Sequence, residues 1–99
     1  NNMSLVEILK SGNYRVIDVR EPLELEMDGS VEGAENIPLG EVESRKDEIL
    51  SKDNETNTII ICKSGGRSTK ALEYLQSQGL KNGYNGGGFA SFRETLENL

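Results

Sequence analysis

One segment near the middle of the chain constrains the fold more than any other. It begins with three isoleucines, Ile59 to Ile61, and the apolar run stops at Cys62, the only cysteine in the sequence. A short β-branched run of this kind is typical of a buried strand that is covered on both faces. Two glycines, two cations and then a helical pattern follow. A buried strand that leads through a glycine loop into a helix is the repeating unit of an α/β fold.

The rest of the chain alternates between strand and helix patterns in the same way. Strands are predicted at residues 14–19, 34–38, 58–61 and 80–85, and helices at residues 5–11, from 22 onward, 41–50, 68–78 and 89–99. We therefore expect one domain, residues 1–99, of the α/β class. It should have a mostly parallel central sheet of about five short strands, with helices on both faces. Ligands of such sheets bind beyond the carboxyl ends of the strands.

Local signals support several of these boundaries. Ser4 and Glu7 have the spacing of a capping box, and Gly12 is placed to end the first helix. Pro22 suits the first position of the second helix. The triple glycine at residues 86–88 has two interpretations, a pocket wall that needs close backbone approach or a flexible connection.

Composition excludes several classes of function. The formal net charge of −6 argues against nucleic acid or an anionic membrane as the main partner. With no histidine and one cysteine, the chain cannot use Ser-His-Asp or Cys-His catalysis or form an internal disulfide. We expect no metal site and no cofactor. We expect a cytoplasmic location, or a periplasmic one if Asn1 is the processed end of a longer chain; Met3 could instead be the native start.

The loop after the central strand favours an ionised cysteine. A thiol at the end of a strand, facing a helix N-terminus, lies in the positive field of backbone N–H groups, which favours the nucleophilic thiolate. Gly65 and Gly66 allow the backbone to curl around one anionic centre, while Lys63 and Arg67 add positive charge. A buried structural cysteine is the simpler interpretation of Cys62. The glycines and cations that follow it favour a cysteine that attacks or carries an anionic group.

The neighbouring residues receive narrower predictions. Lys63 and Ser64 are each expected either to contact the substrate or only to face solvent. Arg67 is expected to bind substrate, to fix the loop by hydrogen bonds, or both. Ser68 belongs to the same substrate-binding loop, and its side chain is read as the helix N-cap rather than as a catalytic hydroxyl. An ion pair between Asp18 and Arg20 is expected either to brace the active edge or to be an ordinary strand-end pair.

Four motifs in this order resemble the single-domain rhodaneses, a family of sulfurtransferases. Residues 16–22 read Val-Ile-Asp-Val-Arg-Glu-Pro and residues 33–39 read Gly-Ala-Glu-Asn-Ile-Pro-Leu. Cys62 is followed by four residues and then Arg67 and Ser68, as in that family's active-site loop, and a Gly-Gly segment with Phe89 and Phe92 closes the chain. The sequence departs from the family at residues 29–34, which lack the usual histidine, and at Phe92, where tryptophan is common.

The resemblance implies a rhodanese-like fold and a mechanism. Cys62 would attack the outer sulfur of a small anionic donor such as thiosulfate and keep that sulfur as a persulfide. Cyanide or a thiol acceptor, either a small molecule or a protein such as a thioredoxin-like protein, would then remove it. Backbone N–H groups would stabilise the persulfide anion.

Two other functions remain open at this point. Cysteine phosphatases and arsenate reductases resemble this architecture but place five residues between cysteine and arginine, whereas residues 63–66 number four. A loop shorter by one residue forms a smaller cradle, which favours sulfur over phosphate. Non-catalytic rhodanese-like interaction modules often lack the cysteine, and Cys62 is present here.

Overall fold

A computed structural model describes residues 3–99, so the questions about Asn1 and Asn2 lie outside the described residues. Within this range the fold is α/β, and its one sheet has four strands, all parallel, in the order β2-β1-β3-β4. The predicted parallel sheet is confirmed, with four strands rather than about five. The strands are β1 (Tyr14–Asp18), β2 (Glu35–Asn36), β3 (Asn57–Cys62) and β4 (Gly83–Gly88).

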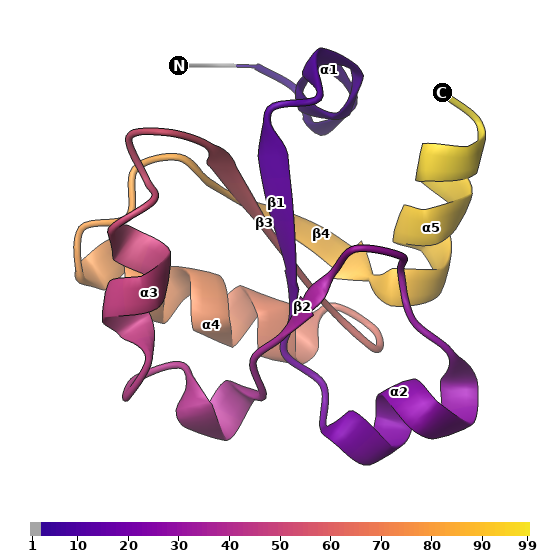
Figure 1. The fold of residues 1–99 in the computed structure, drawn as a ribbon, viewed down its shortest axis with the longest axis horizontal. Coiled ribbons are helices and arrows are strands. Elements are labelled where there is room, and N and C mark those ends of the chain that lie inside the picture. Colours follow the sequence, from indigo (N-terminus) through magenta and orange to yellow (C-terminus); the bar gives the residue numbers. More distant parts are fainter. Residues whose placement is uncertain (1–2) are drawn as a thin grey trace.

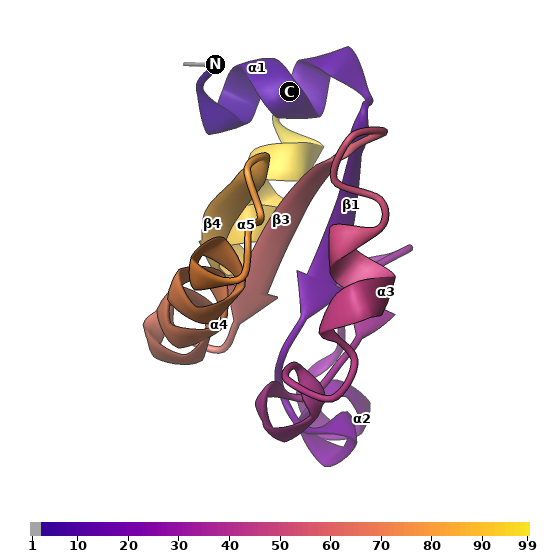
Figure 2. The same cartoon turned by 90° about the vertical axis from the view of Figure 1, so that its left-hand side faces the viewer.

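Helices cover both faces of the sheet, as expected (Figures 1 and 2). The short helix α3 and the longer helix α4 pack on one face, and α1 and α5 pack on the other. Figure 1 shows α2 beyond the carboxyl ends of β1 and β3, close to the loop that leads into α4. The helical elements are α1 (Leu5–Ser11), α2 (Pro22–Asp28), the 3₁₀ turn η1 (Leu39–Glu41), α3 (Lys46–Leu50), α4 (Gly66–Ser77) and α5 (Phe89–Glu97).

The period of two along β3 decides which way the cysteine points. Ile59 and Ile61 join the core on the side of α1 and α5, whereas Ile60 and Cys62 join the core on the side of α3 and α4. All four are at most 1% exposed. The prediction of a strand covered on both faces is therefore confirmed, and Cys62 faces α4.

Several predicted helix boundaries are confirmed. The Ser4 side chain accepts a hydrogen bond from the backbone N–H of Glu7, and the Glu7 side chain accepts one from the backbone N–H of Ser4. Gly12 ends α1 in the left-handed conformation, with φ of 75°. Pro22 occupies the first position of α2.

The predicted helix at residues 41–50 is wrong in its extent. The segment forms η1, a series of turns and the short helix α3. Val42 and Ile49 are buried, but the inward positions between them fall at Arg45 and Lys46. An apolar face that stops after one residue cannot hold a continuous helix against the sheet.

The interpretation of the triple glycine at residues 86–88 as a flexible connection is wrong. It is part of strand β4 and not a flexible connection. A Cβ atom at Gly86 would lie 2.6 Å from the side chain of Ile61, so the strand needs glycine to pack this closely on β3. Tertiary packing overrides the low strand propensity of glycine here.

Candidate active site

The site lies at the carboxyl edge of the sheet, where β3 ends at Cys62 (Figure 1). Residues 63–65 form the connecting loop, and α4 begins at Gly66. Strand β1 ends beside β3, because Asp18 pairs with Ile61. The structure therefore brings the two predicted groups, the cysteine loop and the Asp18–Arg20 segment, to one edge of the sheet.

Backbone N–H groups converge on the Cys62 sulfur. The N–H of Gly65 donates to Sγ at 3.0 Å, and the N–H of Ser68 donates to it at 3.3 Å. Gly65 has a φ of 104°, which favours glycine and turns the backbone back toward the sulfur. The predicted cradle is confirmed in its geometry: two N–H donors converge on an atom that becomes negative when it ionises.

Opposing effects act on the pKa of the Cys62 thiol. Burial raises the pKa, but hydrogen bonds from the Ser68 hydroxyl and from the backbone N–H groups of Ser68, Gly65 and Ser64 together lower it below its usual value. Of the two influences that the sequence predicts, backbone N–H groups and loop cations, the hydrogen bonds to Sγ account for the lowered pKa. A lowered pKa supplies more of the reactive thiolate at neutral pH.

The prediction that Ser68 caps α4 is wrong. The helix begins two residues earlier than expected, its N-cap is Gly65, and Ser68 lies inside the first turn. The Ser68 side chain is fully buried, and its Oγ lies 3.4 Å from the Cys62 Sγ and 2.8 Å from the Oδ1 of Asn85. In place of a side-chain cap, the Cys62 sulfur accepts the N–H groups of the N-cap Gly65 and of Ser68 in the first turn.

Asn85 is the residue that sequence reasoning missed. It lies in β4 opposite Ile60, on the sheet face that Cys62 and α4 share. Its side chain bonds both Ser68 and Thr69 of α4. The available signal was a polar residue beside three glycines in the last strand, but a register shift in β4 hid which face it occupies.

A close backbone contact fixes the far wall of the loop. A Cβ atom at Gly88 would lie 2.7 Å from the carbonyl oxygen of Lys63 and 3.6 Å from the Cα of Ser64. The close-approach interpretation of the triple glycine is therefore confirmed at this position. Any larger residue at position 88 would push against the loop next to the cysteine.

The two loop cations behave differently. Lys63 and Ser64 are exposed, and within residues 3–99 Lys63 takes part in none of the ion pairs. Arg67 forms a bidentate ion pair with Glu24 of α2, at 2.7 and 2.9 Å. Arg67 thus ties the start of α4 to α2 through a carboxylate.

The Arg67–Glu24 pair has electrostatic consequences on both sides. Hydrogen bonding from Arg67 lowers the pKa of Glu24 to about 2. The bond to Glu24 raises the pKa of Arg67, and a charge on Cys62 raises it further. Arg67 is therefore inside the field of the nucleophile, but Glu24 balances its charge.

Asp18 and Arg20 form the predicted ion pair, and both are fully buried. Arg20 Nη2 lies 2.8 Å from the Asp18 carboxylate and 2.9 Å from the carbonyl oxygen of Gly29. The guanidinium also lies over the ring of Phe89, 3.7 Å from its centroid. Phe89 directly follows Gly88, so the pair contacts the residue next to the glycine that approaches the loop.

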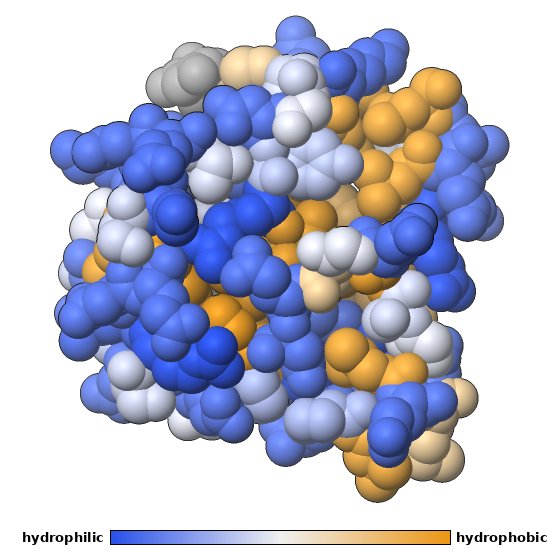
Figure 3. Space-filling view, in the orientation of Figure 1, coloured by the Kyte–Doolittle hydropathy of each residue, from blue (hydrophilic) through white to orange (hydrophobic). Residues whose placement is uncertain are grey.

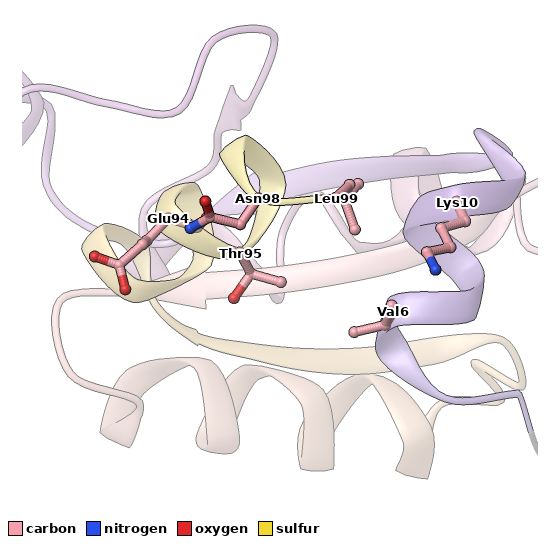
Figure 4. Close-up of a pocket in the computed structure, with 6 residues that line it drawn as sticks. All are labelled: Val6, Lys10, Glu94, Thr95, Asn98 and Leu99. Atoms are coloured by element: carbon pink, nitrogen blue, oxygen red, sulfur yellow. The ribbon is translucent and has the colours of Figure 1, made fainter.

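Other parts of the described chain show no second chemical centre of this kind. Within residues 3–99, no group of three or more His, Cys, Asp or Glu side chains lies close enough to hold a metal ion. Over the same range, no helix is long and apolar enough to span a bilayer. An open groove between α1 and α5 contains none of the predicted site residues (Figure 4). Its lining residues are Val6, Lys10, Glu94, Thr95, Asn98 and Leu99.

Comparison with known proteins assigns the chain to one family of folds. The family model for the rhodanese-like domain matches residues 2–95. A putative mitochondrial thiosulfate sulfurtransferase from Schizosaccharomyces pombe is 39% identical over 77 residues, which cover 68% of this chain and 54% of that protein. The chain spans between 24% and 60% of the length of the curated relatives it matches.

Solved structures agree with this match. The human single-domain sulfurtransferase has a TM-score of 0.71 and 28% identity, with 88% of this chain and 87% of that chain covered. A Rhodopseudomonas palustris protein of unknown function, described as a possible tyrosine phosphatase, has a TM-score of 0.75 and 28% identity, with 90% and 74% covered.

Proposed function

Because the chain belongs to the rhodanese-like domain family, we propose that it is a thiosulfate-type sulfurtransferase that works through a persulfide on Cys62. The observation that carries the proposal is the hydrogen bonding of the Cys62 sulfur, which accepts N–H groups from Gly65 and Ser68 in a buried site. The same donors that stabilise the thiolate can stabilise a sulfur anion one atom further out. Relatives named as sulfurtransferases support the reaction class.

The first half-reaction begins with the Cys62 thiolate. It attacks the outer sulfur of thiosulfate, the S–S bond of thiosulfate breaks, and sulfite leaves with the electron pair. The outer sulfur stays on Sγ as a persulfide anion, so the total charge is unchanged. No histidine base is needed, because hydrogen bonding already favours the ionised cysteine.

The second half-reaction returns the enzyme to its starting state. A thiolate acceptor or cyanide attacks the outer sulfur, the persulfide S–S bond breaks, and its electron pair returns to Sγ. The acceptor leaves with the sulfur, and Cys62 is again a thiolate. The partners are thus a small anionic sulfur donor and a thiol acceptor, either a small molecule or a thioredoxin-like protein.

Charge at the mouth of the site favours an anionic donor. Lys63 is exposed beside the nucleophile, whereas the charge of Arg67 is balanced by Glu24. We assign Lys63 and Ser64 to donor recruitment, Gly65 and Gly66 to the shape of the cradle, and Arg67 to holding the loop. Asp18 and Arg20 support the loop from β1.

Mass spectrometry of the intact protein tests the proposal directly. Treatment with thiosulfate should add the mass of one sulfur atom, cyanide should remove it, and the Cys62→Ser variant should gain none. A protein that gains no sulfur at any thiosulfate concentration, although it is folded and its cysteine alkylates, would refute the proposal.

A phosphatase remains the second candidate, since one structural neighbour is described as a possible tyrosine phosphatase. The four residues between Cys62 and Arg67 disfavour it, because they enclose a smaller anion site. Hydrolysis of an aryl phosphate, measured beside thiosulfate:cyanide transfer, separates the two. Phosphate hydrolysis that exceeds sulfur transfer and disappears in Cys62→Ser would reverse the ranking.

A further inference from the structure

The side chain of Asn85 is held in one orientation by its neighbours. Its Oδ1 accepts the backbone N–H of Gly87 at 2.8 Å, and its Nδ2 donates to the Oγ1 of Thr69 at 2.9 Å. A backbone N–H can only donate, so the atom facing Gly87 must be the amide oxygen. The same oxygen lies 2.8 Å from the Ser68 hydroxyl and can only accept from it.

A local irregularity of β4 creates this arrangement. The strand register shifts by one residue after Asn85, so Ile60 pairs with Asn85 but Ile61 pairs with Gly87. Gly87 has a φ of 76°, a conformation that favours glycine, and its N–H turns back to the Asn85 side chain. Such shifts are common next to active sites, where they re-aim a side chain.

The Ser68 hydroxyl has a single hydrogen and three acceptors within reach. These are Asn85 Oδ1 at 2.8 Å, the carbonyl oxygen of Gly65 at 3.1 Å and Cys62 Sγ at 3.4 Å. The Gly65 carbonyl also accepts the Thr69 hydroxyl at 2.8 Å. Asn85 Oδ1 is the nearest of the three acceptors, so it is the main competitor of the cysteine sulfur for this hydrogen.

The protonation state of Cys62 decides which acceptor receives the hydrogen of the Ser68 hydroxyl. A neutral thiol donates its own hydrogen to Ser68 Oγ, and Ser68 then donates to Asn85. A thiolate has no hydrogen to give, so Ser68 must turn toward the sulfur to stabilise it. Asn85 Oδ1 loses that bond but keeps the one from Gly87, so its oxygen is never left without a donor.

We propose that Asn85 is a positioning residue that competes with the Cys62 sulfur for the Ser68 hydrogen, and so sets how readily the sulfur becomes and remains an anion. The proposal deepens the proposed function, on which it rests for the role of Cys62 as nucleophile. When an acceptor takes the outer sulfur, the S–S bond breaks and the electron pair passes to Sγ. Ser68 then turns from Asn85 to the new thiolate.

Several charged groups also face this region, and the test must separate their effects. Arg67 approaches from α4 with its partner Glu24 from α2, Lys63 approaches from the loop, and the Asp18–Arg20 pair approaches from β1. Substitutions at position 85 leave these side chains in place. The hydroxyl of Ser68 is the largest of the hydrogen-bonding influences that lower the pKa of Cys62, after the opposing effect of burial.

The test is the rate of Cys62 alkylation by iodoacetamide as a function of pH. Asn85→Ala frees the Ser68 hydroxyl for the thiolate. The pH midpoint of the alkylation rate should therefore fall by on the order of half a pH unit. Asn85→Asp keeps a stronger acceptor in the same place and also adds a negative charge, so it should raise the midpoint more when the Ser68 hydroxyl is present than in the double variant Ser68→Ala/Asn85→Asp. Ser68→Ala should also raise it, and the double variant Ser68→Ala/Asn85→Ala should match Ser68→Ala alone.

Each outcome decides the question. Three results would overturn the role of Asn85: an unchanged midpoint in a folded Asn85→Ala, an Asn85→Asp shift of equal size with and without the Ser68 hydroxyl, or additive shifts in Ser68→Ala/Asn85→Ala. If Asn85→Ala does not fold, the comparison of the Asn85→Asp shift with and without the Ser68 hydroxyl still decides, because the added charge acts in both backgrounds and the competition only in one. Alkylation does not require sulfur transfer: the expected midpoints in a protein that never gains sulfur from thiosulfate would refute the proposed function and leave the Asn85 role standing.

Discussion

Replacing Glu24 with glutamine should loosen the attachment of α2 to the start of α4. Glu24 accepts two hydrogen bonds from Arg67, at 2.7 and 2.9 Å, and a third from the backbone N–H of Glu21 at 2.8 Å. Arg67 lies one residue before Ser68, whose N–H bonds the cysteine sulfur. The pair therefore couples a helix outside the core to the geometry of the active site.

The pKa of Glu24 sets the size of the effect. A fall from the usual 4.5 to about 2 corresponds to a ceiling of about 3.5 kcal/mol, at about 1.4 kcal/mol for each pH unit. The side chains of Glu24 and Arg67 remain 26% and 33% exposed, so water and salt screen the pair. We therefore expect Glu24→Gln to lower the free energy of unfolding by about 1 kcal/mol at pH 7.

The pH dependence follows from the direction of the shift. The carboxyl has a lower pKa in the folded protein than in the unfolded chain, so its contribution is fully present above pH 4.5. It is lost as the pH falls toward about 2. The difference in stability between the wild-type protein and Glu24→Gln should thus be constant from pH 7 to pH 5 and should shrink below that.

Urea denaturation at pH 7, 5, 4 and 3 measures this difference, with Glu26→Gln as the matched control. Glu26 is an exposed carboxylate on the same helix, so the control removes the same charge without the pair. The pairing argument would be refuted if both variants lost the same stability at pH 7. It would also be refuted if the Glu24→Gln difference stayed constant down to pH 3.

Three further predictions concern other contacts. Asp18→Asn leaves the charge of Arg20 buried without its partner, so urea denaturation should show a loss of about 3–5 kcal/mol; a loss below 1 kcal/mol would contradict this. Gly88→Ala forces a Cβ against the Lys63 carbonyl, so urea denaturation and the activity assay should show reduced stability and reduced sulfur transfer. The control Gly40→Ala, which has open space around it, should alter neither. Lys63→Ala should raise the KM for thiosulfate more than it lowers kcat, by an effect on the order of 1 kcal/mol or less that fades in high salt, and an unchanged KM at low salt would show that Lys63 is only a solvated residue.

The sequence by itself determined the fold class and the centre of the site. The β-branched run before Cys62 can be buried on both faces only in a sheet covered by helices, and the alternation of strand and helix patterns favours parallel strands. Gly65 and Gly66 identified a loop that curls around the cysteine, and Asp18 and Arg20, at and just after the end of β1, identified a pair at the same edge. These inferences use local chemistry and periodicity, which the chain carries at each position.

Only the tertiary structure decided the partners of individual side chains. The start of α4 at Gly66 rather than at Ser68 depends on a sulfur acceptor that lies on another element, β3. Arg67 pairs with Glu24, which is 43 residues away in the sequence, because α2 lies beside the loop. No local pattern records such distances.

The glycine-rich strand is the clearest case. Three consecutive glycines indicate freedom of the backbone when they are read locally. In the fold they allow β4 to pack closely on β3 and on the loop, and the shift in register at Gly86 turns Asn85 toward Ser68. The contact between Asn85 and the active-site helix exists because two strands approach each other more closely than any side chain would allow, and that closeness is a property of the assembled sheet.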